Sequence, residues 1–341
     1  MPRASIDLDV PSPVRRLSGN ATGELWIKDD GQISSVYGGN KPRKLAHLLG
    51  EAKRRDAKRL VTVGAIGSHH VLATGLLGKH IGLSTTAVAL PRPYSQHAEQ
   101  TTKQILAAGV ELVPLGRPLD LPRAVAALMR RDDYWIPPGG SSGLGALGYW
   151  EATVELKRQI DSGQIPEPDV IVVALGSGGT AAGLLAGIVA TGIRSHLVAV
   201  SVLHLPMARL LVEALARRVL TRIGGPSRPD FSSIFTIDYE WVGAGYGHAT
   251  AAGELAMAEA AKFGLKLEST YTGKAFAGAL AWLSGANGRG SVPVWSKLRV
   301  PTPSNPRCIL FWSTLSTVSL ASTATGAATL PHVFSRLFRS S

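Results

Sequence analysis

Lys41 lies in the segment GGNKPRKL, residues 38–45, whose composition suits covalent chemistry at an amine. Apolar residues recur at helical spacing from Leu45 to Ala52, which predicts a helix that begins at about Pro42. Pro42 favours an extended conformation at Lys41 and places it at or beside the N-cap. Because the positive end of a helix disfavours a charged lysine, the amine should lose its proton more easily, as a Schiff base requires. From spacing alone, a glycine turn before an amphipathic helix is the more common explanation.

A second candidate segment is GAIGSHH, residues 64–70, which follows a predicted strand and precedes a predicted helix. Ligands bind at the carboxyl ends of strands in parallel sheets, so Ser68 and His69 are candidates for ligand contact. Ser68 fits equally well as a simple N-cap, and His69 and His70 fit as surface residues. No metal site is predicted from the two histidines, because adjacent residues of a helix do not face each other.

A glycine-rich turn lies between the apolar strand predicted at residues 170–175 and the helix predicted from residue 181. The turn consists of Gly176, Ser177, Gly178, Gly179 and Thr180. Small residues let the backbone wrap around an anion, and a helix N-terminus supplies N–H donors and a favourable dipole. The turn has neither the lysine of a Walker loop nor the spacing of a dinucleotide fingerprint. Its hydroxyls and its position favour phosphate binding over a plain turn.

Two further segments have a composition that suits the lining of a cleft. Residues 137–145 are rich in Gly and Ser and could hold a carboxylate or simply link two domains. Tyr271 and Thr272 place a phenol and a hydroxyl beside a turn before a predicted helix. Neither segment is informative by itself.

Predicted strands and helices alternate along the chain and must position all of these residues. Such alternation predicts parallel sheets covered by helices, which is an α/β fold class. The strands form two groups, so we expect two α/β domains with a cleft between them. The clearest strands are predicted at residues 60–63, 85–90, 110–114, 170–175 and 197–202.

The composition is that of a globular protein. With 341 residues, 45% hydrophobic and 18% charged, the chain can form one large domain or two ordinary ones. Its single cysteine, Cys308, excludes an intrachain disulfide and is compatible with a reducing cytoplasm. Neither a signal peptide nor an apolar run of about twenty residues is evident, so no membrane association is expected.

The net charge of +12 is scattered over predicted helices, where charge usually marks the solvated face. No nucleic-acid-binding motif accompanies it, so no nucleic-acid partner is expected. A general preference for anionic small molecules fits the same charge equally well.

Taken together in this order, the segments resemble the D-cysteine desulfhydrase and 1-aminocyclopropane-1-carboxylate (ACC) deaminase family. That family belongs to the tryptophan-synthase-β-like enzymes, which use pyridoxal 5'-phosphate (PLP). The resemblance extends over residues 25–314. It implies that Lys41 is the PLP lysine with Asn40 beside it, and that Ser68 contacts the substrate. His69 stands where the family usually has an asparagine that contacts the ring hydroxyl of PLP.

The resemblance also assigns the remaining candidate residues. It matches residues 176–180 to the phosphate loop and Tyr271 to the active-site tyrosine, and it implies that Thr272 and Thr314 contact the cofactor. The last strand of the family usually ends in a glycine-containing turn near the pyridine ring. Here the sequence FWSTLS, residues 311–316, has no glycine, which leaves open a PLP-binding protein with lost or altered catalysis.

The reaction implied by the resemblance is that of a PLP-dependent lyase or deaminase acting on a small amino acid. PLP stabilises a carbanion at Cα, and the protein determines which bond breaks. Lys41 is the natural base for the α-proton, and Ser68 and Tyr271 could handle the carboxylate or leaving-group protons. ACC deaminases resemble one another in having a glutamate after the tyrosine, whereas the neutral Thr272 makes a weaker electron sink. We therefore favour D-cysteine-desulfhydrase-like elimination, to a keto acid and ammonia, over ACC deamination.

Domain boundaries and assembly are expected as follows. A large PLP-binding domain comprises residues 1–45 and 146–320, and a small α/β domain comprises residues 46–145. Each has an open, twisted, mostly parallel sheet, and the PLP site lies in the cleft. Residues 321–341 are expected to form a weakly structured basic tail. The resemblance further implies a cytoplasmic homodimer, and no metal is expected. A nucleotide-binding α/β protein, with a structural Lys41, is the remaining alternative.

Overall fold

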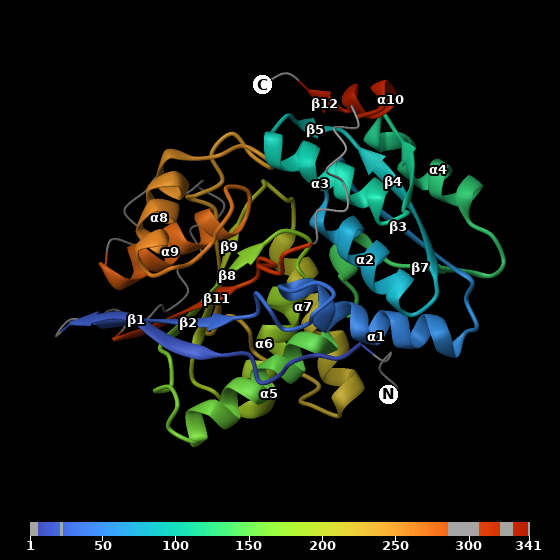
Figure 1. Ribbon diagram of the computed structural model, residues 1–341. Helices are drawn as coiled ribbons and strands as arrows, with labels where there is room; N and C mark the ends of the chain where they lie inside the picture. Colours follow the sequence, from blue (N-terminus) through green and yellow to red (C-terminus); the bar gives the residue numbers. More distant parts are fainter. Residues whose placement is uncertain (1–5, 21–22, 286–306, 321–329, 340–341) are drawn as a thin grey trace.

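In the computed structural model, two α/β units lie side by side, each built on its own sheet (Figure 1). The structure describes residues 6–20, 23–285, 307–320 and 330–339. The larger sheet has the strand order β1-β2-β11-β8-β9-β10, and all its pairs are parallel except β1 with β2. Its strands are β1 (Val14–Asn20), β2 (Gly23–Asp29), β8 (Val170–Leu175), β9 (His196–Ser201), β10 (Phe235–Asp238) and β11 (Cys308–Ser313).

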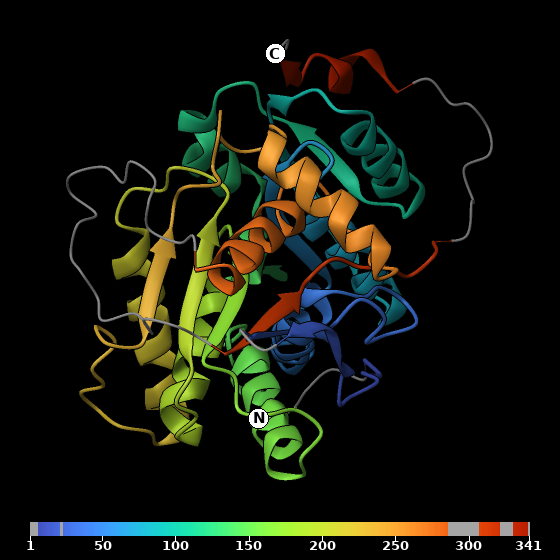
Figure 2. The ribbon, with the colours of Figure 1, turned by 90° about the vertical axis from the view of Figure 1, so that its left-hand side faces the viewer.

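Alternating side chains of the central strands build a separate core on each face of the larger sheet. In β8, Ile171 and Val173 belong to the core under α5, α6 and α7, whereas Val170 and Val172 belong to the core under α8 and α9. Both faces are therefore buried, which explains the uninterrupted apolar sequence of this strand. Figure 2 looks onto α8 and α9, which cover one face of the sheet. The helices are α5 (Leu147–Asp161), α6 (Gly179–Thr191), α7 (Ala208–Ile223), α8 (Ala251–Lys262) and α9 (Thr272–Leu283).

The smaller sheet has the strand order β6-β4-β3-β7, with every pair parallel. Leu45 and Leu49 of α1 share a buried core with Leu60 of β3 and Leu72 of α2. The elements of this unit are β3 (Arg59–Ala65), β4 (Ser84–Leu90), β6 (Glu111–Pro114), β7 (Asp133–Trp135), α1 (Asn40–Arg54), α2 (His69–His80), α3 (Gln96–Ala107), α4 (Leu121–Leu128) and the 3-10 turns η1 (Pro118–Asp120) and η2 (Pro138–Gly140). The expected α/β class with mostly parallel sheets is confirmed, and the domain boundaries stay a prediction.

The end of the chain returns to the smaller unit, at the top of Figure 1. Residues 330–339 contain α10 (His332–Ser335) and β12 (Phe338–Arg339), and β12 pairs in parallel with β5 (Arg92–Pro93). The expectation of a weakly structured tail is therefore wrong for these residues, because their apolar side chains find a core in which to bury. The rest of that expected tail lies outside the described residues. The shared core consists of Ile66, Ala89, Leu330, Phe334 and Leu337.

A buried cluster of charges joins α1 to the larger unit. Arg43 donates from Nη2 to Asp30 Oδ1 at 2.8 Å and from Nη1 to Glu155 Oε2 at 3.0 Å. Lys28 Nζ donates to Oε1 of the same glutamate at 2.5 Å. Asp30 is fully buried and Arg43 is 3% exposed, so each of these charges depends on its partners. The cluster therefore fixes the start of α1 against β2 and α5.

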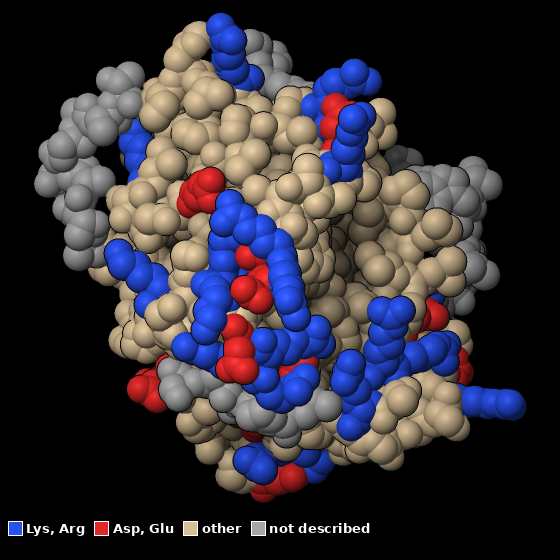
Figure 3. Space-filling view, turned by 90° about the vertical axis from the view of Figure 1, so that its right-hand side faces the viewer, with Lys and Arg blue, Asp and Glu red and all other residues tan. Residues whose placement is uncertain are grey.

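Basic side chains on the surface are interleaved with acidic ones. Figure 3 shows one face on which Lys and Arg gather with Asp and Glu among them. Arg54 and Arg55, at the end of α1, for example, both donate to Glu51. Exposed pairs of this kind are typical of a solvated helix face. Across the described ranges, the helices are too short or too polar to span a membrane.

Candidate active site

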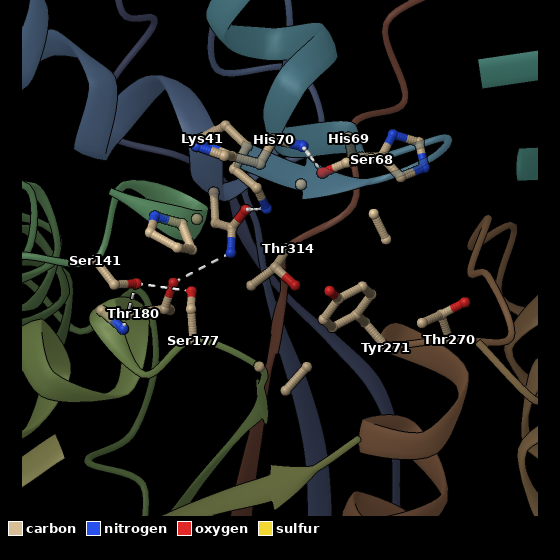
Figure 4. Close-up of a pocket in the computed structure, with 18 of the residues that line it drawn as sticks. Lys41, Ser68, His69, His70, Ser141, Ser177, Thr180, Thr270, Tyr271 and Thr314 are labelled. Carbon is tan, nitrogen blue, oxygen red and sulfur yellow. Dashed lines mark hydrogen bonds between the residues drawn. The ribbon is translucent and has the colours of Figure 1, made fainter. Parts of the chain in front are cut away.

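A cavity of about 550 Å³ opens between the two sheets. It is lined by the carboxyl ends of β3, β4 and β8 and by the residues after β11, where parallel sheets usually bind ligands. Figure 4 shows side chains from both units directed toward this common space. The structure brings together here all twelve residues that the sequence singled out: Asn40, Lys41, Ser68, His69, Gly176, Ser177, Gly178, Gly179, Thr180, Tyr271, Thr272 and Thr314.

Lys41 lies in the first turn of α1. The helix begins at Asn40, two residues before the expected start, so Lys41 is helical and the expectation of an extended conformation is wrong. The early start comes from Gly39, whose φ is 72° and whose missing Cβ would lie 2.5 Å from the carbonyl oxygen of Thr314. That carbonyl accepts the N–H of Asn40 at 3.1 Å. Pro42 fits the first turn because no helical N–H bond is needed there.

The amine of Lys41 is held in a buried, polar environment. Its Nζ donates to Asn40 Oδ1 at 2.5 Å. Burial lowers the pKa of Lys41 to about 8, against the opposing effect of the Glu268 carboxylate. Burial, and not the helix dipole that was expected to act here, is the main cause of the lowered pKa. A lysine with this pKa is partly neutral near physiological pH and can act as a nucleophile or a base.

The glycine turn connects β8 to α6 and packs against two other segments of the cavity wall. α6 begins at Gly179, again two residues before the expected start. Asn40 Nδ2 donates to Thr180 Oγ1 at 3.1 Å, which links the turn to α1. Ser141 Oγ accepts the N–H of Gly179 at 3.0 Å and lies 2.7 Å from Ser177 Oγ (Figure 4). The Gly/Ser-rich stretch that contains Ser141 therefore lines the cavity.

Close packing requires glycine in this turn. A Cβ on Gly176 would lie 2.9 Å from Cε1 of Tyr271, and a Cβ on Gly179 would lie 2.6 Å from Ser141 Oγ. Gly178 has a φ of 88°, which L side chains rarely adopt. The first N–H groups of α6 have no acceptor within the helix and end at the cavity. Bare backbone, hydroxyls and a helix N-terminus together make a cradle that fits a phosphate group.

Ser68 and His69 lie at the start of α2, on the wall formed by the smaller unit. Ser68 Oγ accepts the N–H of His70 at 3.2 Å, so it is an N-cap as well as a cavity residue. His69 bonds through Nδ1 to Tyr37 Oη at 2.7 Å and through Nε2 to His97 Nε2 at 2.8 Å. Burial, followed by the neighbouring His97, lowers the pKa of His69 to about 3, so its ring stays neutral. His70 is buried, so the suggestion that it is a surface residue is wrong.

Tyr271 faces a second tyrosine, Tyr246, to which its Oη donates at 3.1 Å. Burial raises the pKa of Tyr271 well above its ordinary value, so the phenol keeps its proton. Glu268 accepts the backbone N–H groups of Thr270, Tyr271 and Thr272, each at 2.8 Å. It also donates its own N–H to Thr272 Oγ1 at 2.9 Å. Glu268 therefore fixes the start of α9 and the position of Tyr271.

The structure adds cavity residues that sequence reasoning missed. Tyr246 and Lys44 had a local signal, since Tyr246 stands in the glycine-rich run GAGYG, residues 243–247, and Lys44 stands in the segment GGNKPRKL, residues 38–45. No group of three or more His, Cys, Asp or Glu side chains in the described ranges could hold a metal ion. The added residues include Tyr37, Lys44, Arg92, His97, Tyr246 and Glu268.

Comparison with known proteins gives a consistent set of similarities. A family model described as pyridoxal-phosphate dependent enzyme matches residues 8–293. The D-cysteine desulfhydrase of Klebsiella pneumoniae (strain 342) is 32% identical over 287 residues, which cover 80% of this chain and 85% of that protein. The D-cysteine desulfhydrase of Salmonella paratyphi A is 32% identical over 296 residues, 81% of this chain and 87% of that one. The solved structure of an ACC deaminase homologue is 26% identical and has a TM-score of 0.76. The match covers 92% of this chain and 91% of the homologue's chain.

Proposed function

The chain belongs to the family of pyridoxal-phosphate dependent enzymes, and from this premise we propose that it eliminates the β-substituent of a small amino acid, D-cysteine first. With D-cysteine and one water, the products are pyruvate, ammonia and hydrogen sulfide. The observation that carries the proposal is the meeting of Lys41, the glycine turn and Tyr271 around one cavity. The cofactor is PLP, and the enzyme is a lyase acting on an amino acid.

The cavity has a place for each part of the cofactor. Lys41 Nζ would bind it covalently, and the turn at residues 176–180 would hold its phosphate. Asn40, His69 and Thr314 would contact its ring, together with Thr272. When bound, PLP stabilises negative charge at Cα of the substrate. The protein must then hold the substrate and move its protons.

Three side chains would do this work. Lys41 Nζ accepts the α-proton, because its lowered pKa leaves part of the amine neutral. Ser68 Oγ and the N-terminus of α2 hold the substrate carboxylate. Tyr271 Oη stabilises the departing thiolate by donating a hydrogen bond to it, since the raised pKa keeps the phenol protonated. Tyr246 Oη, 3.1 Å away, is hydrogen-bonded to the same phenol.

Thr272 supports elimination of a thiolate over opening of a cyclopropane ring. Its side chain is neutral, and its hydroxyl accepts the N–H of Glu268 at 2.9 Å. The Glu268 carboxylate is itself engaged by three backbone N–H groups at 2.8 Å. Thr272 has no carboxylate, and the carboxylate of Glu268 is already bonded, so neither residue would keep the pyridine nitrogen of the cofactor protonated. A weaker electron sink suffices for a good leaving group such as thiolate.

A substrate panel on the PLP-loaded protein tests the function directly. We expect pyruvate and ammonia from D-cysteine at a rate at least tenfold above that from L-cysteine, L-serine or ACC, with one sulfide per pyruvate. Keto acid release from ACC at a rate comparable to that from D-cysteine would overturn the preference for desulfhydrase activity over ACC deamination. A protein that carries PLP and yields no keto acid from any of these amino acids would be a binder without catalysis.

Gly179→Ala tests the phosphate cradle. The new Cβ would lie 2.6 Å from Ser141 Oγ, so the wall of the cradle must move. We expect affinity for PLP to fall about tenfold, the cost of one charge-assisted hydrogen bond. The affinity for pyridoxal, which lacks the phosphate, should not change. Absorbance titration of the cofactor-free protein measures both, and Gly116→Ala, with no atom within 4 Å, is the control. If the affinities for PLP and pyridoxal fell equally, the phosphate would not bind at this turn.

A homodimer in the cytoplasm, as the resemblance implies, completes the proposal. Met207 and Leu210, exposed by 73% and 61% at the start of α7, are apolar side chains of the kind that a second copy covers.

A further inference from the structure

Arg92 is a buried cation without an acidic partner in the described ranges. It lines the cavity and is 6% exposed. Its guanidinium donates through Nε to the carbonyl of Pro93 at 3.3 Å and lies 5.5 Å from the ring centre of Tyr246. By contrast, the equally buried Arg43 bonds to two carboxylates. Because a buried charge is normally paired, Arg92 lacks a counter-ion that a ligand can supply.

Main-chain contacts fix the position of Arg92 in the cavity wall. Its N–H donates to the carbonyl of Leu337 at 3.1 Å, within the pairing of β5 with β12. Gly247 leaves room for the guanidinium, since a Cβ there would lie 3.0 Å from Arg92 Nη2. The side chain itself is held by its Nε bond to Pro93 and by the ring of Tyr246, and a side chain so held loses little conformational entropy when it binds a ligand. Arg92 is therefore a preorganised group of the cavity wall.

Arg92 lies on the part of the cavity wall that also carries His69, Tyr246 and Tyr271. Its charge acts on both His69 and Tyr271, and its guanidinium stacks on Tyr246. Figure 4 shows His69 and Tyr271 on one side of the cavity and Ser141, Ser177 and Thr180 on the other. The contacts of Arg92 are with Pro93, Leu337 and Tyr246 and do not include the glycine turn, so Arg92 is not part of the phosphate cradle. In the proposed mechanism, Tyr271 marks the position of the departing group.

The charges that line the cavity favour an anion. Among the described lining residues, Lys41, Lys44 and Arg92 are basic, and Glu268 is the one carboxylate. Glu268 is engaged by backbone N–H groups at the start of α9. A substrate α-carboxylate and a cofactor phosphate would account for two anionic groups, at Ser68 and at the glycine turn. Arg92 remains as a site for a third.

We propose that Arg92 determines substrate specificity by binding a negatively charged group at Cβ of the amino acid. The inference rests on the proposed function and narrows its substrate class to amino acids whose β-substituent is anionic when bound. A thiolate meets this condition after loss of its proton, and a carboxylate or a sulfonate meets it permanently. Guanidinium groups bind oxyanions such as a carboxylate through two N–H bonds at once, and a thiolate through its charge.

Aspartate and asparagine test the preference for an anionic substituent. They are nearly isosteric, and the group attached to Cβ is a charged carboxylate in one and a neutral carboxamide in the other. Both enantiomers of each are titrated into the PLP-loaded protein, and the visible spectrum and calorimetry report binding without turnover. We expect aspartate of one configuration to bind at least tenfold more tightly than the matching asparagine, as for a charge-assisted hydrogen bond. In Arg92→Leu the two affinities should become about equal, and Arg92→Lys should keep part of the preference for aspartate. Arg54→Leu, which removes an exposed arginine from α1, should leave the ratio unchanged.

The outcomes separate this inference from the proposed function. Equal binding of aspartate and asparagine by the wild type, or an unchanged ratio in Arg92→Leu, would overturn the inference. Each variant must keep the visible band of bound PLP, which shows that the site is folded. A wild type that releases pyruvate from D-cysteine and does not distinguish the two ligands would leave the lyase standing and refute the role of Arg92. Absence of turnover with an intact preference would refute the lyase instead.

Discussion

Replacing Lys41 by alanine is expected to remove the visible absorption of the purified protein and to abolish its lyase activity. The variant loses the Nζ that would bind PLP covalently and the base that accepts the α-proton. Loss of the base alone lowers the rate by about 10²–10⁴-fold. Absorbance after gel filtration in excess PLP, and pyruvate release from D-cysteine, measure the two effects. If the protein instead bound a nucleotide and Lys41 were structural, the wild type would have no visible absorption band, and Lys41→Ala would cause no loss of lyase activity.

Lys44 provides the matched control for this prediction. It lies on the same helix, lines the same cavity and is buried, but its Nζ donates to the carbonyl of Gly139. Lys44→Ala should therefore keep the absorption band. If the band disappears in Lys44→Ala and persists in Lys41→Ala, the assignment of the two lysines is reversed.

The pH dependence of cofactor uptake follows from the pKa of about 8 for Lys41. The neutral amine reacts, and its fraction rises as the pH increases through that value. Uptake of PLP by the cofactor-free wild type should therefore accelerate between about pH 7 and pH 9 and level off above. Stopped-flow absorbance measures this rate. A rate independent of pH over that interval would contradict the lowered pKa.

The candidate site could be predicted where the residues lie beside regular elements. Lys41, Ser68 and the glycine turn each stand between a strand or loop and a helix, and the carboxyl ends of parallel strands converge. That geometric rule is general, so three separate segments could be placed around one cavity. The starts of α1 and α6 were missed by two residues, because Thr314 and Ser141 accept the first N–H groups of these helices.

Arg92, His97 and Glu268 could not be predicted in the same way. Each stands in a segment whose local pattern resembles an ordinary loop or helix end, and only tertiary contacts bring it to the cavity. The same holds for residues 330–339, whose strand forms because β5 offers an edge and the smaller unit a core. Local periodicity contains no information about such distant partners.

Asp30→Asn is expected to destabilise the fold by about 3–5 kcal/mol, the range for breaking a buried ion pair. The carboxylate accepts from Arg43 through Oδ1 and from Tyr149 and Trp312 through Oδ2, at 2.8, 2.6 and 2.8 Å. Asparagine has one acceptor and one donor end, so its amide N–H would face the indole N–H or the guanidinium. The midpoint of urea unfolding measures the loss. Asp161→Asn, an exposed carboxylate paired with Lys157, is the control and should cost about 1 kcal/mol or less.

The same variant has a defined pH signature. Burial alone would raise the pKa of Asp30, but Arg43 and Lys28 hold it below its ordinary value of 3.8. A carboxyl whose pKa is depressed by folding adds stability above its unfolded pKa and loses it as the pH falls through the folded pKa. Wild type and Asp30→Asn should therefore differ most above about pH 4 and converge below it. A constant difference down to pH 2 would show that the charge of Asp30 does not stabilise the fold.

The same cluster also positions Lys41. The carbonyl of Asp30 accepts the N–H of Gly39 at 2.7 Å, so loosening the cluster should also loosen the start of α1, where Lys41 lies.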